Sequence, residues 1–295
     1  MSKINTSGEY AVVKKSRYIV LLFTLLTNYS IAQSTWFDDQ SIGSTVLLEK
    51  SYNATLQPFG TGFLLFNYTN IAIPYLVTCA HLINNRPEIY VSITADSEFV
   101  AYVNKMKNPD DYSLILGKTK WILFGQKMYA QIKLQKNKTY VVHPDSSIDI
   151  AVIPVDIGSQ AEIDGKTIKL AKINAIPKLF YKYRADVKLG DEVFFVGFPL
   201  GWGAVEKILN PLVRSGSIAW YSKEYKYFLV DALSWGGNSG SPVFLKRNLS
   251  NNVASLIGMV KGHYSDPYSD QNAGLAECIW LDDILTTVDL AKKLQ

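Results

Sequence analysis

Short apolar runs, interrupted by turn residues, make up most of the chain after residue 40. Between residues 130 and 135, Ile132 and Leu134 alternate with polar neighbours, which is the two-residue period of a strand with one buried face. Other runs of strand length are Gly62–Phe66, Ile71–Cys79, Tyr90–Ile93, Ile150–Val155 and Glu192–Phe198. Many short strands with turns between them predict an all-β fold of barrels or sandwiches, not a parallel α/β fold.

The end of the chain follows a helical period. Its apolar residues recur near four-residue intervals, at Trp280, Ile284, Leu285, Val288 and Leu294. Two acids, Asp282 and Asp283, come early in this run, where the positive end of a helix dipole favours carboxylates. The pattern predicts a C-terminal helix of about 12 to 15 residues. The segment Asp156–Lys188 is more weakly patterned, and we expect it to connect two halves of the chain.

The first 32 residues have the pattern of a signal peptide. The basic residues Lys14, Lys15 and Arg17 precede the apolar run Tyr18–Leu26, and small residues follow in Ser30–Ala32. The apolar run is shorter than the roughly 20 residues that a membrane-spanning helix needs. We therefore expect cleavage after residue 32, no stable membrane insertion afterwards, and a secreted or periplasmic protein exported from a bacterial cell. The alternative is a membrane-anchored protein with an uncleaved leader.

Charge and cysteine content exclude several classes of protein. The formal net charge is +4, but the leader holds four basic residues and one acid, so the remainder carries only +1. This balance gives no reason to expect a nucleic-acid partner. The two cysteines, Cys79 and Cys278, cannot form a disulfide-rich scaffold, and neither has the spacing of a metal site. Two buried free thiols are the favoured interpretation, with one long-range disulfide as the alternative.

The most distinctive string is Gly236–Pro242, which reads GGNSGSP. Glycines on both sides of Ser239 permit a tight turn that leaves backbone N–H groups exposed beside the hydroxyl. A serine nucleophile needs this arrangement, because nearby N–H donors stabilise the oxyanion that develops during acyl transfer. Taken alone, however, such a string often forms only a turn.

A serine nucleophile also needs a base, and the chain has three histidines. His81 ends the apolar run Leu76–Ala80, a position that suits either a rigidly held base or a histidine of the core. His143 precedes Pro144 in a polar stretch and is expected at the surface. His263 is expected in a loop.

An acid lies within the apolar run Ser147–Ile153. A carboxylate in that setting is costly unless it is paired, and an imidazole N–H would pair Asp149. The alternative is an aspartate that caps a turn before the strand, and Asp145 fits that alternative better than Asp149 does.

These segments together resemble the trypsin-like serine peptidases, nearest the bacterial Deg/HtrA type. Thr78–His81 matches the motif T-A-A-H with Cys79 in place of the first alanine, Asp149–Val152 matches D-[LI]-A-[VL], and Gly237–Gly240 matches G-[DN]-S-G. The order His, Asp, Ser is that of chymotrypsin. Further matches in order extend the resemblance over roughly residues 40 to 265: Gly60–Phe63, Gly190–Asp191, Gly197–Gly201 and Ser215–Ile218.

The resemblance implies the fold. It is expected to be all-β, with two six-stranded antiparallel β-barrels of the chymotrypsin type followed by a C-terminal α-helix. The first barrel would comprise residues 33–175 and carry His81 and Asp149. The second would comprise residues 176–295 and carry Ser239.

The resemblance also implies the chemistry of a serine endopeptidase that acts on proteins or peptides without a cofactor or metal. His81 would be the general base, Asp149 would orient it, and Ser239 would form the acyl-enzyme. The amides of Gly237 and Ser239 would form the oxyanion hole. The alternatives are a non-catalytic binding protein on the same scaffold and, less favoured because no G-x-S-x-G is present, an esterase.

The resemblance places the substrate pocket as well. Its base lies six positions before the nucleophile, at Leu233, and its opposite wall comes from the strand that contains Lys261 and Gly262. A leucine gives a basic side chain no counter-charge, so we expect cleavage after small or medium apolar residues such as Val, Ala or Leu. The rival interpretation is that Asp231 reaches the pocket and favours Lys or Arg.

Two features depart from the resembled family. Ser241 stands where many relatives have glycine. The stretch between His81 and Asp149 is long, and its part rich in Lys and Asn, Asn104–Lys138, is expected to form an extra hairpin near the cleft. We expect no PDZ module after the barrels, because the 30 residues after residue 265 fit the helix.

Overall fold

The computed structural model describes most of the chain after residue 40. The described residues are 41–53, 55–66, 74–105, 113–116, 119–124, 127–155, 160–171, 174–201, 210–246, 254–266, 268–269 and 271–294. The predicted signal peptide therefore lies outside them. Within these ranges, no helix combines the length and the apolar character that crossing a membrane requires.

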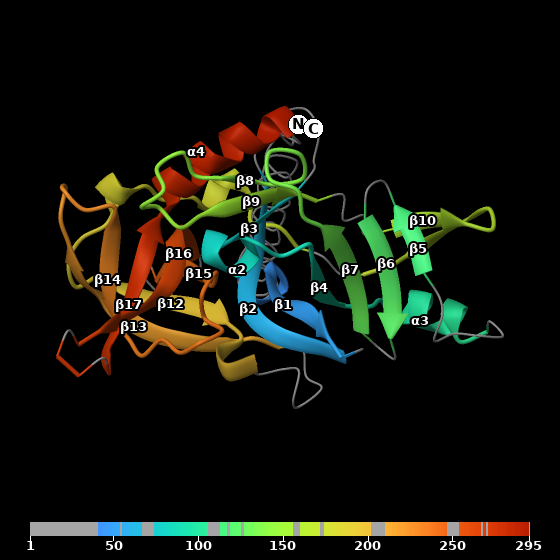
Figure 1. Cartoon of the computed structure of the whole chain (residues 1–295), viewed down its shortest axis with the longest axis horizontal. Coiled ribbons are helices and arrows are strands. Elements are labelled where there is room, and N and C mark those ends of the chain that lie inside the picture. The colour runs from blue at the N-terminus through green and yellow to red at the C-terminus, as the bar shows by residue number, and fades with distance from the viewer. Residues whose placement is uncertain are drawn as a thin grey trace, which may run out of the picture.

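The first half of the chain forms a nine-stranded antiparallel sheet, in the order β5-β6-β7-β4-β1-β2-β3-β9-β8 (Figure 1). Its strands are β1 (Thr45–Tyr52), β2 (Thr55–Phe66), β3 (Pro74–Thr78), β4 (Glu88–Thr94), β5 (Ser113–Leu116), β6 (Thr119–Phe124), β7 (Lys127–Lys133), β8 (Val141–Val142) and β9 (Ala151–Pro154). A separate hairpin joins β10 (Gln160–Ile163) to β11 (Lys166–Lys169) within the predicted connecting segment.

The second half forms a closed six-stranded barrel, in the order β12-β13-β14-β17-β16-β15. Its strands are β12 (Glu192–Gly197), β13 (Leu212–Tyr221), β14 (Tyr227–Asp231), β15 (Pro242–Lys246), β16 (Ala254–Ser265) and β17 (Asn272–Trp280). The all-β prediction of the chymotrypsin type is confirmed. The first half differs in detail from the expected six-stranded barrel, because it is a curled, half-barrel sheet of nine strands that includes the added hairpin of β5 and β6.

Among the helices whose full ranges the structure describes, only the last is longer than two turns. They are α2 (Ala80–Ile83), α3 (Ser97–Val103) and α4 (Leu281–Ala291), with 3-10 turns η2 (Lys178–Phe180), η3 (Arg184–Asp186), η4 (Pro199–Gly201) and η5 (Lys292–Leu294). The predicted C-terminal helix is confirmed as α4, which η5 continues. Its buried face includes Ile284, Val288 and Ala291, and it packs against β8, β9, β16 and β17.

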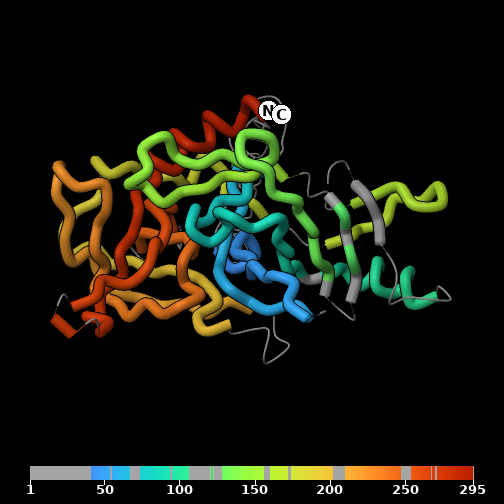
Figure 2. Tube along the Cα trace, viewed as in Figure 1, coloured from blue at the N-terminus to red at the C-terminus, as the bar shows by residue number. Residues whose placement is uncertain are grey.

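One apolar cluster spans both halves, and a second lies within the barrel half alone. Strand residues of the barrel, among them Phe194, Val196 and Met259, pack in the same buried cluster as Phe63 and Val77 of the first sheet. Burying a side chain of this size contributes roughly 1.5–3 kcal/mol. The chain trace accordingly shows the sheet and the barrel side by side, with α4 running across both (Figure 2). This docking brings the ends of β3 and β9 against the barrel.

The predicted extra hairpin exists, but its expected position near the cleft is wrong. β5 and β6 form an antiparallel hairpin that adds to the outer side of β7. Five strands separate β5 from β3 in the sheet order, and Figure 1 shows the hairpin at the end of the molecule away from the barrel. The hairpin pairs with the edge of β7 that β4 leaves open, and so satisfies backbone groups that would otherwise be unpaired there.

Candidate active site

Strand pairing in the first sheet brings His81 to Asp149. β3 and β9 run antiparallel, with Thr78 opposite Ala151, so the residues just after β3 lie beside the residues just before β9. The chain turns after β3 into the four-residue helix α2, which presents His81 at its first turn. The sheet register therefore places the two side chains together although 68 positions separate them.

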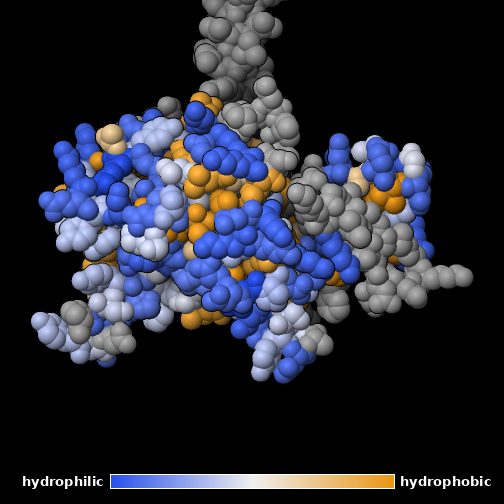
Figure 3. All heavy atoms as spheres, turned by 45° about the horizontal axis from the view of Figure 1, so that its top comes forward, coloured by the Kyte–Doolittle hydropathy of each residue, from blue (hydrophilic) through white to orange (hydrophobic). Residues whose placement is uncertain are grey.

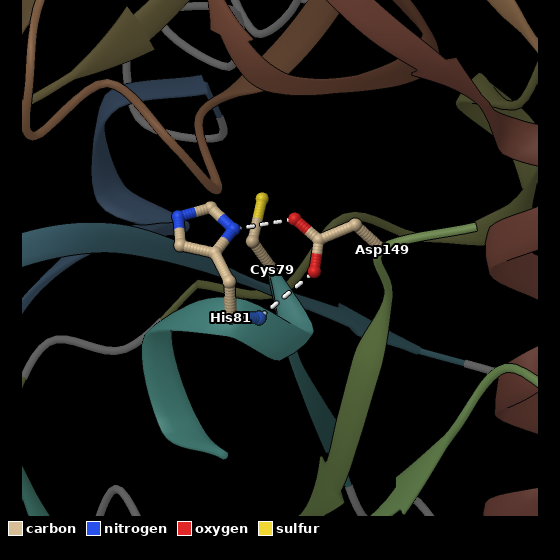
Figure 4. A group of neighbouring side chains, drawn as sticks. All are labelled: Cys79, His81 and Asp149. Atoms are coloured by element: carbon tan, nitrogen blue, oxygen red, sulfur yellow. Dashed lines mark hydrogen bonds and ion pairs between the residues drawn. The ribbon is translucent and has the colours of Figure 1, made fainter. Parts of the chain in front are cut away.

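Asp149 uses both of its carboxylate oxygens on His81 (Figure 4). Oδ1 accepts the His81 backbone N–H at 2.8 Å, and Oδ2 pairs with ring Nδ1. Burial by itself would raise the pKa of Asp149, but the hydrogen bonds and charge of His81 outweigh burial and hold that pKa below its usual range. The side chain of His81 stays 50% exposed, so Nε2 can serve a substrate-facing role.

Glycine is required on both sides of Ser239. Gly237 has φ +98°, and a Cβ there would lie 2.4 Å from the carbonyl oxygen of Phe198. Gly240 has φ +91°, and a Cβ there would lie 1.8 Å from the carbonyl oxygen of Thr61. Other residues would be strained at this φ and would collide with backbone. The predicted tight turn is therefore present between β14 and β15.

The same turn leaves two amides unused. Asn238 donates its N–H to the carbonyl of Trp235 at 3.0 Å. Among the described residues, by contrast, no hydrogen bond uses the N–H of Gly237 or of Ser239. An oxyanion hole needs two such donors close to the nucleophile.

Thr61 of the first sheet holds this turn of the barrel. Its hydroxyl donates to the carbonyl of Gly237 at 2.7 Å and accepts the N–H of Phe198 at 3.0 Å. Its own N–H donates to the carbonyl of Ser239 at 3.0 Å. The carbonyls of the turn are thus tied to β2, which keeps them from turning toward a substrate oxyanion.

The Ser239 hydroxyl points at the barrel wall. It donates to the carbonyl of Lys261 at 2.8 Å. In the described part of the chain, no hydrogen bond joins Ser239 to His81, so transfer of the hydroxyl proton to His81 requires rotation of the serine side chain. Catalytic hydrogen bonds often form only when substrate is bound.

The Cys79 thiol lies close to the side chains of His81 and Asp149. Both cysteines are free and buried, which confirms the favoured interpretation. The Cys79 thiol lies 3.4 Å from the carbonyl of Val260 and 3.8 Å from that of Lys261. Burial raises the pKa of this thiol well above its usual value, and the nearby charge of Asp149 raises it further. The sequence did not indicate that Cys79 would lie beside Asp149.

The residues expected to form the substrate pocket, Leu233, Lys261 and Gly262, all belong to the barrel half, which also carries Ser239. Lys261 has a partner that the sequence did not predict. Leu233 is 46% exposed, and a Cβ on Gly262 would meet no atom within 4 Å. Lys261 forms an ion pair with Glu277, with 2.8 Å between Nζ and Oε1. Glu277 was missed because only the β16–β17 register, in which it stands opposite Gly262, reveals it. Lys261 therefore brings no unbalanced charge to this wall.

The other histidines differ from expectation. His143 is buried, with 8% of its surface exposed, and its Nδ1 accepts the N–H of Asp145 at 3.1 Å. His263 lies within β16 and is exposed, not in a loop. Asp145 caps the turn as expected, since Oδ1 accepts both the N–H and the hydroxyl of Ser147.

A pocket of about 750 Å³ opens beside His81 and Asp149. Apolar residues, including Val142 and Leu290, form part of its wall, and Lys136 and Lys293 also line it. Figure 3 views the face that carries α4 and shows hydrophobic side chains gathered near its centre among hydrophilic ones.

Comparison with known proteins gives a family and a set of structural neighbours. Residues 60–250 match the trypsin-like peptidase domain. Solved structures similar to the chain include an HtrA-type protease, AlgW, with a tripeptide (14% identity, TM-score 0.49, covering 88% of this chain and 64% of that one) and with a decapeptide (14% identity, TM-score 0.48, 88% and 67%). The chain spans 61% of the length of the first AlgW structure matched. No curated protein matches it.

Proposed function

The chain belongs to the trypsin-like peptidase family, a family of serine-type endopeptidases, and we propose that it hydrolyses peptide bonds through an acyl-enzyme formed on Ser239. His81 acts as the general base and Asp149 orients it. The observation that carries this proposal is the pairing of both Asp149 carboxylate oxygens with His81, at the junction that also holds the Ser239 turn.

The reaction begins when the substrate carbonyl enters the turn. Its oxygen accepts hydrogen bonds from the backbone N–H groups of Gly237 and Ser239. The Ser239 hydroxyl then rotates away from the Lys261 carbonyl and donates to Nε2 of His81. His81 removes the proton as Oγ attacks, then gives it to the leaving amine. Water releases the acyl group by the same steps in reverse. Such a base typically contributes roughly 10²–10⁴-fold, and each oxyanion donor roughly 10²–10³-fold.

The substrate backbone docks on β16. β15 pairs with β16 only as far as Met259, and beyond it no described strand pairs with that edge of β16. An extended peptide can add there as a further strand. Gly262 leaves open space over this edge, and the carbonyl of Lys261 is next to Ser239.

The pocket selects small or medium apolar side chains before the scissile bond. Leu233 supplies an apolar base, and the ion pair of Lys261 with Glu277 leaves no net charge on the wall. A buried Lys or Arg would then lie without a partner, at a cost of several kcal/mol. Asp231 lies exposed at the end of β14.

We also propose that the protein is exported through its N-terminal leader. The basic region, the short apolar run and the small residues at 30–32 support this. The mass of the protein recovered from its native host tests it: a mature chain that begins near Gln33 is expected, and an intact mass that includes residues 1–32 supports the anchored alternative.

A fluorophosphonate probe for activated serines tests the catalytic proposal. We expect the wild-type protein to be labelled and to cleave peptides, and Ser239→Ala to lose labelling and about 10⁴-fold or more of its activity. Its melting temperature should change little, because only a hydroxyl is lost.

Ser241→Ala is the matched control, since it removes a hydroxyl two positions further along and should leave labelling intact. An unlabelled, inactive wild-type protein would favour the non-catalytic binding protein. Turnover by Ser239→Ala above a preparation blank would exclude Ser239 as the nucleophile.

A further inference from the structure

Three side chains that commonly bind metal ions meet beside the Ser239 turn. The ligand atoms of Cys79, His81 and Asp149 all lie within 4.8 Å of one another. Figure 4 shows the sulfur, a ring nitrogen and a carboxylate oxygen turned toward a common space. It is the one such group of three among the residues that the structure describes. Its members come from the end of β3, from α2 and from the residues before β9.

The donor set fits zinc. Zn²⁺ takes thiolate, imidazole and carboxylate ligands at about 2.0–2.3 Å in a tetrahedron, which places neighbouring ligand atoms roughly 3.3–3.6 Å apart. A shift of about 1 Å would open the His81–Asp149 contact to this spacing. His81 can make that shift, because it is half exposed on a helix of only four residues.

The charges also balance. One thiolate and one carboxylate carry two negative charges, which Zn²⁺ neutralises, and a neutral imidazole adds none. A neutral cluster is the arrangement that a largely buried position tolerates. Cys79 is fully buried and Asp149 has 16% of its side chain exposed, whereas His81 faces outward.

An ion can reach the group from solvent. The pocket of about 750 Å³ is lined by both His81 and Asp149, so a hydrated cation can approach on that side. A water molecule from the pocket would fill the fourth position, since three protein ligands leave one open. The Cys79 thiol is directed at the carbonyls of Val260 and Lys261, so binding an ion would release these two contacts.

We propose that Cys79, His81 and Asp149 form an inhibitory site for Zn²⁺ or a similar thiol-seeking divalent cation; this rests on the proposed function of His81 and Asp149. The ion bonds to the Cys79 sulfur, to His81 Nδ1 and to an Asp149 oxygen. The thiol proton leaves to solvent, and the proton of Nδ1 moves by way of water to Nε2. With Nε2 protonated, His81 cannot accept the Ser239 proton, and hydrolysis stops until the ion leaves.

Inhibition by Zn²⁺ tests the site through activity. Micromolar Zn²⁺ should inhibit peptide hydrolysis by the wild-type enzyme, a chelator should restore it, and Mg²⁺, which prefers oxygen ligands, should have no effect. Cys79→Ala should require at least about tenfold more Zn²⁺ for half inhibition. Cys278→Ala, which removes the other buried thiol, should match the wild type.

Cobalt absorption tests the site without activity. Co²⁺ bound to a thiolate gives a charge-transfer band in the near ultraviolet. This band should appear for the wild type and for Ser239→Ala, and disappear for Cys79→Ala and for Cys79→Ser, the second variant serving if the first does not fold.

Equal zinc inhibition of Cys79→Ala and the wild type, or a cobalt band that survives in both Cys79 variants, would overturn the proposal. An inactive wild-type protein that still shows the Cys79-dependent band would contradict the peptidase mechanism while supporting the metal site. An active wild-type enzyme without the band would contradict the metal site while supporting the peptidase mechanism.

Discussion

His81 contacts both carboxylate oxygens of Asp149. Its backbone N–H donates to Oδ1 at 2.8 Å, and its ring Nδ1 pairs with Oδ2. The backbone N–H can only donate a hydrogen bond, so the side-chain atom that faces it must be an accepting oxygen. The ring therefore always meets the second carboxylate oxygen, and this oxygen keeps the ring proton on Nδ1 and leaves Nε2 ready to accept one.

Asp149→Asn should reverse the tautomer of His81. The backbone N–H holds the amide oxygen at the Oδ1 position, so the amide NH₂ faces Nδ1 and forces the ring proton onto Nε2. We expect kcat to fall by about 10⁴-fold with KM little changed. Steady-state kinetics measure this, and a loss that appears in KM instead of kcat would contradict the orienting role.

Gly237→Ala should disable the oxyanion hole. The added Cβ would lie 2.4 Å from the Phe198 carbonyl at a φ of +98°, so the peptide must turn and carry its N–H away. We expect kcat to fall by about 10²–10³-fold. Gly236→Ala is the matched control, because a Cβ there meets no atom within 4 Å. Equal losses of kcat in Gly237→Ala and Gly236→Ala would show that any substitution in this turn lowers activity, and would contradict a specific role of the Gly237 N–H.

Peptides that differ only before the scissile bond should be cleaved fastest with Val, Ala or Leu there. Lys and Arg should be poor, and Glu277→Gln should make them poorer still by leaving the Lys261 charge unpaired. The control is Glu192→Gln, which breaks an exposed ion pair with Lys246 elsewhere on the barrel. A wild-type preference for Arg or Lys would refute this pocket and favour Asp231.

Asp283→Asn should stabilise the fold at neutral pH. Burial raises the pKa of Asp283, and Asp282 adds to this, while His143, Lys226 and Arg184 partly oppose it. Because the folded state holds this proton more tightly, ionisation costs stability as the pH rises above the unfolded pKa of about 3.9.

Thermal unfolding of Asp283→Asn and the wild type should therefore differ at pH 7 and converge near about pH 3. Asp282→Asn is the control in the same helical turn. That exposed carboxylate accepts the N–H of Arg184 at 3.0 Å, so its loss should not stabilise the protein. A gain from Asp282→Asn equal to that from Asp283→Asn would point to the helix terminus, not to burial.

Local patterns predicted the parts of this molecule that depend on local chemistry. Alternating strands, the C-terminal helix and the glycine turn at Ser239 each follow from neighbouring residues. The roles proposed for His81 and Asp149 followed from where apolar runs stop, combined with the resemblance to a family.

Features set by pairing between distant segments escaped prediction. The Lys261–Glu277 ion pair depends on the register of β16 and β17, and the approach of Cys79 to Asp149 depends on that of β3 and β9. His143 was expected at the surface from its polar neighbours. The structure buries it in the segment that α4 packs against, which no local pattern reveals.

The contacts of Thr61 bear on when the proposed triad assembles. Thr61 braces the Ser239 turn from the other half of the chain, 176 positions before Gly237. Closing the loop between such distant positions costs conformational entropy, which slows the formation of contacts of this kind. A chain whose barrel has folded before it docks on the first sheet holds the serine on an unbraced turn, with His81 and Asp149 elsewhere. By the proposed mechanism, therefore, the newly made chain has no assembled triad, and it gains one only when its two halves meet.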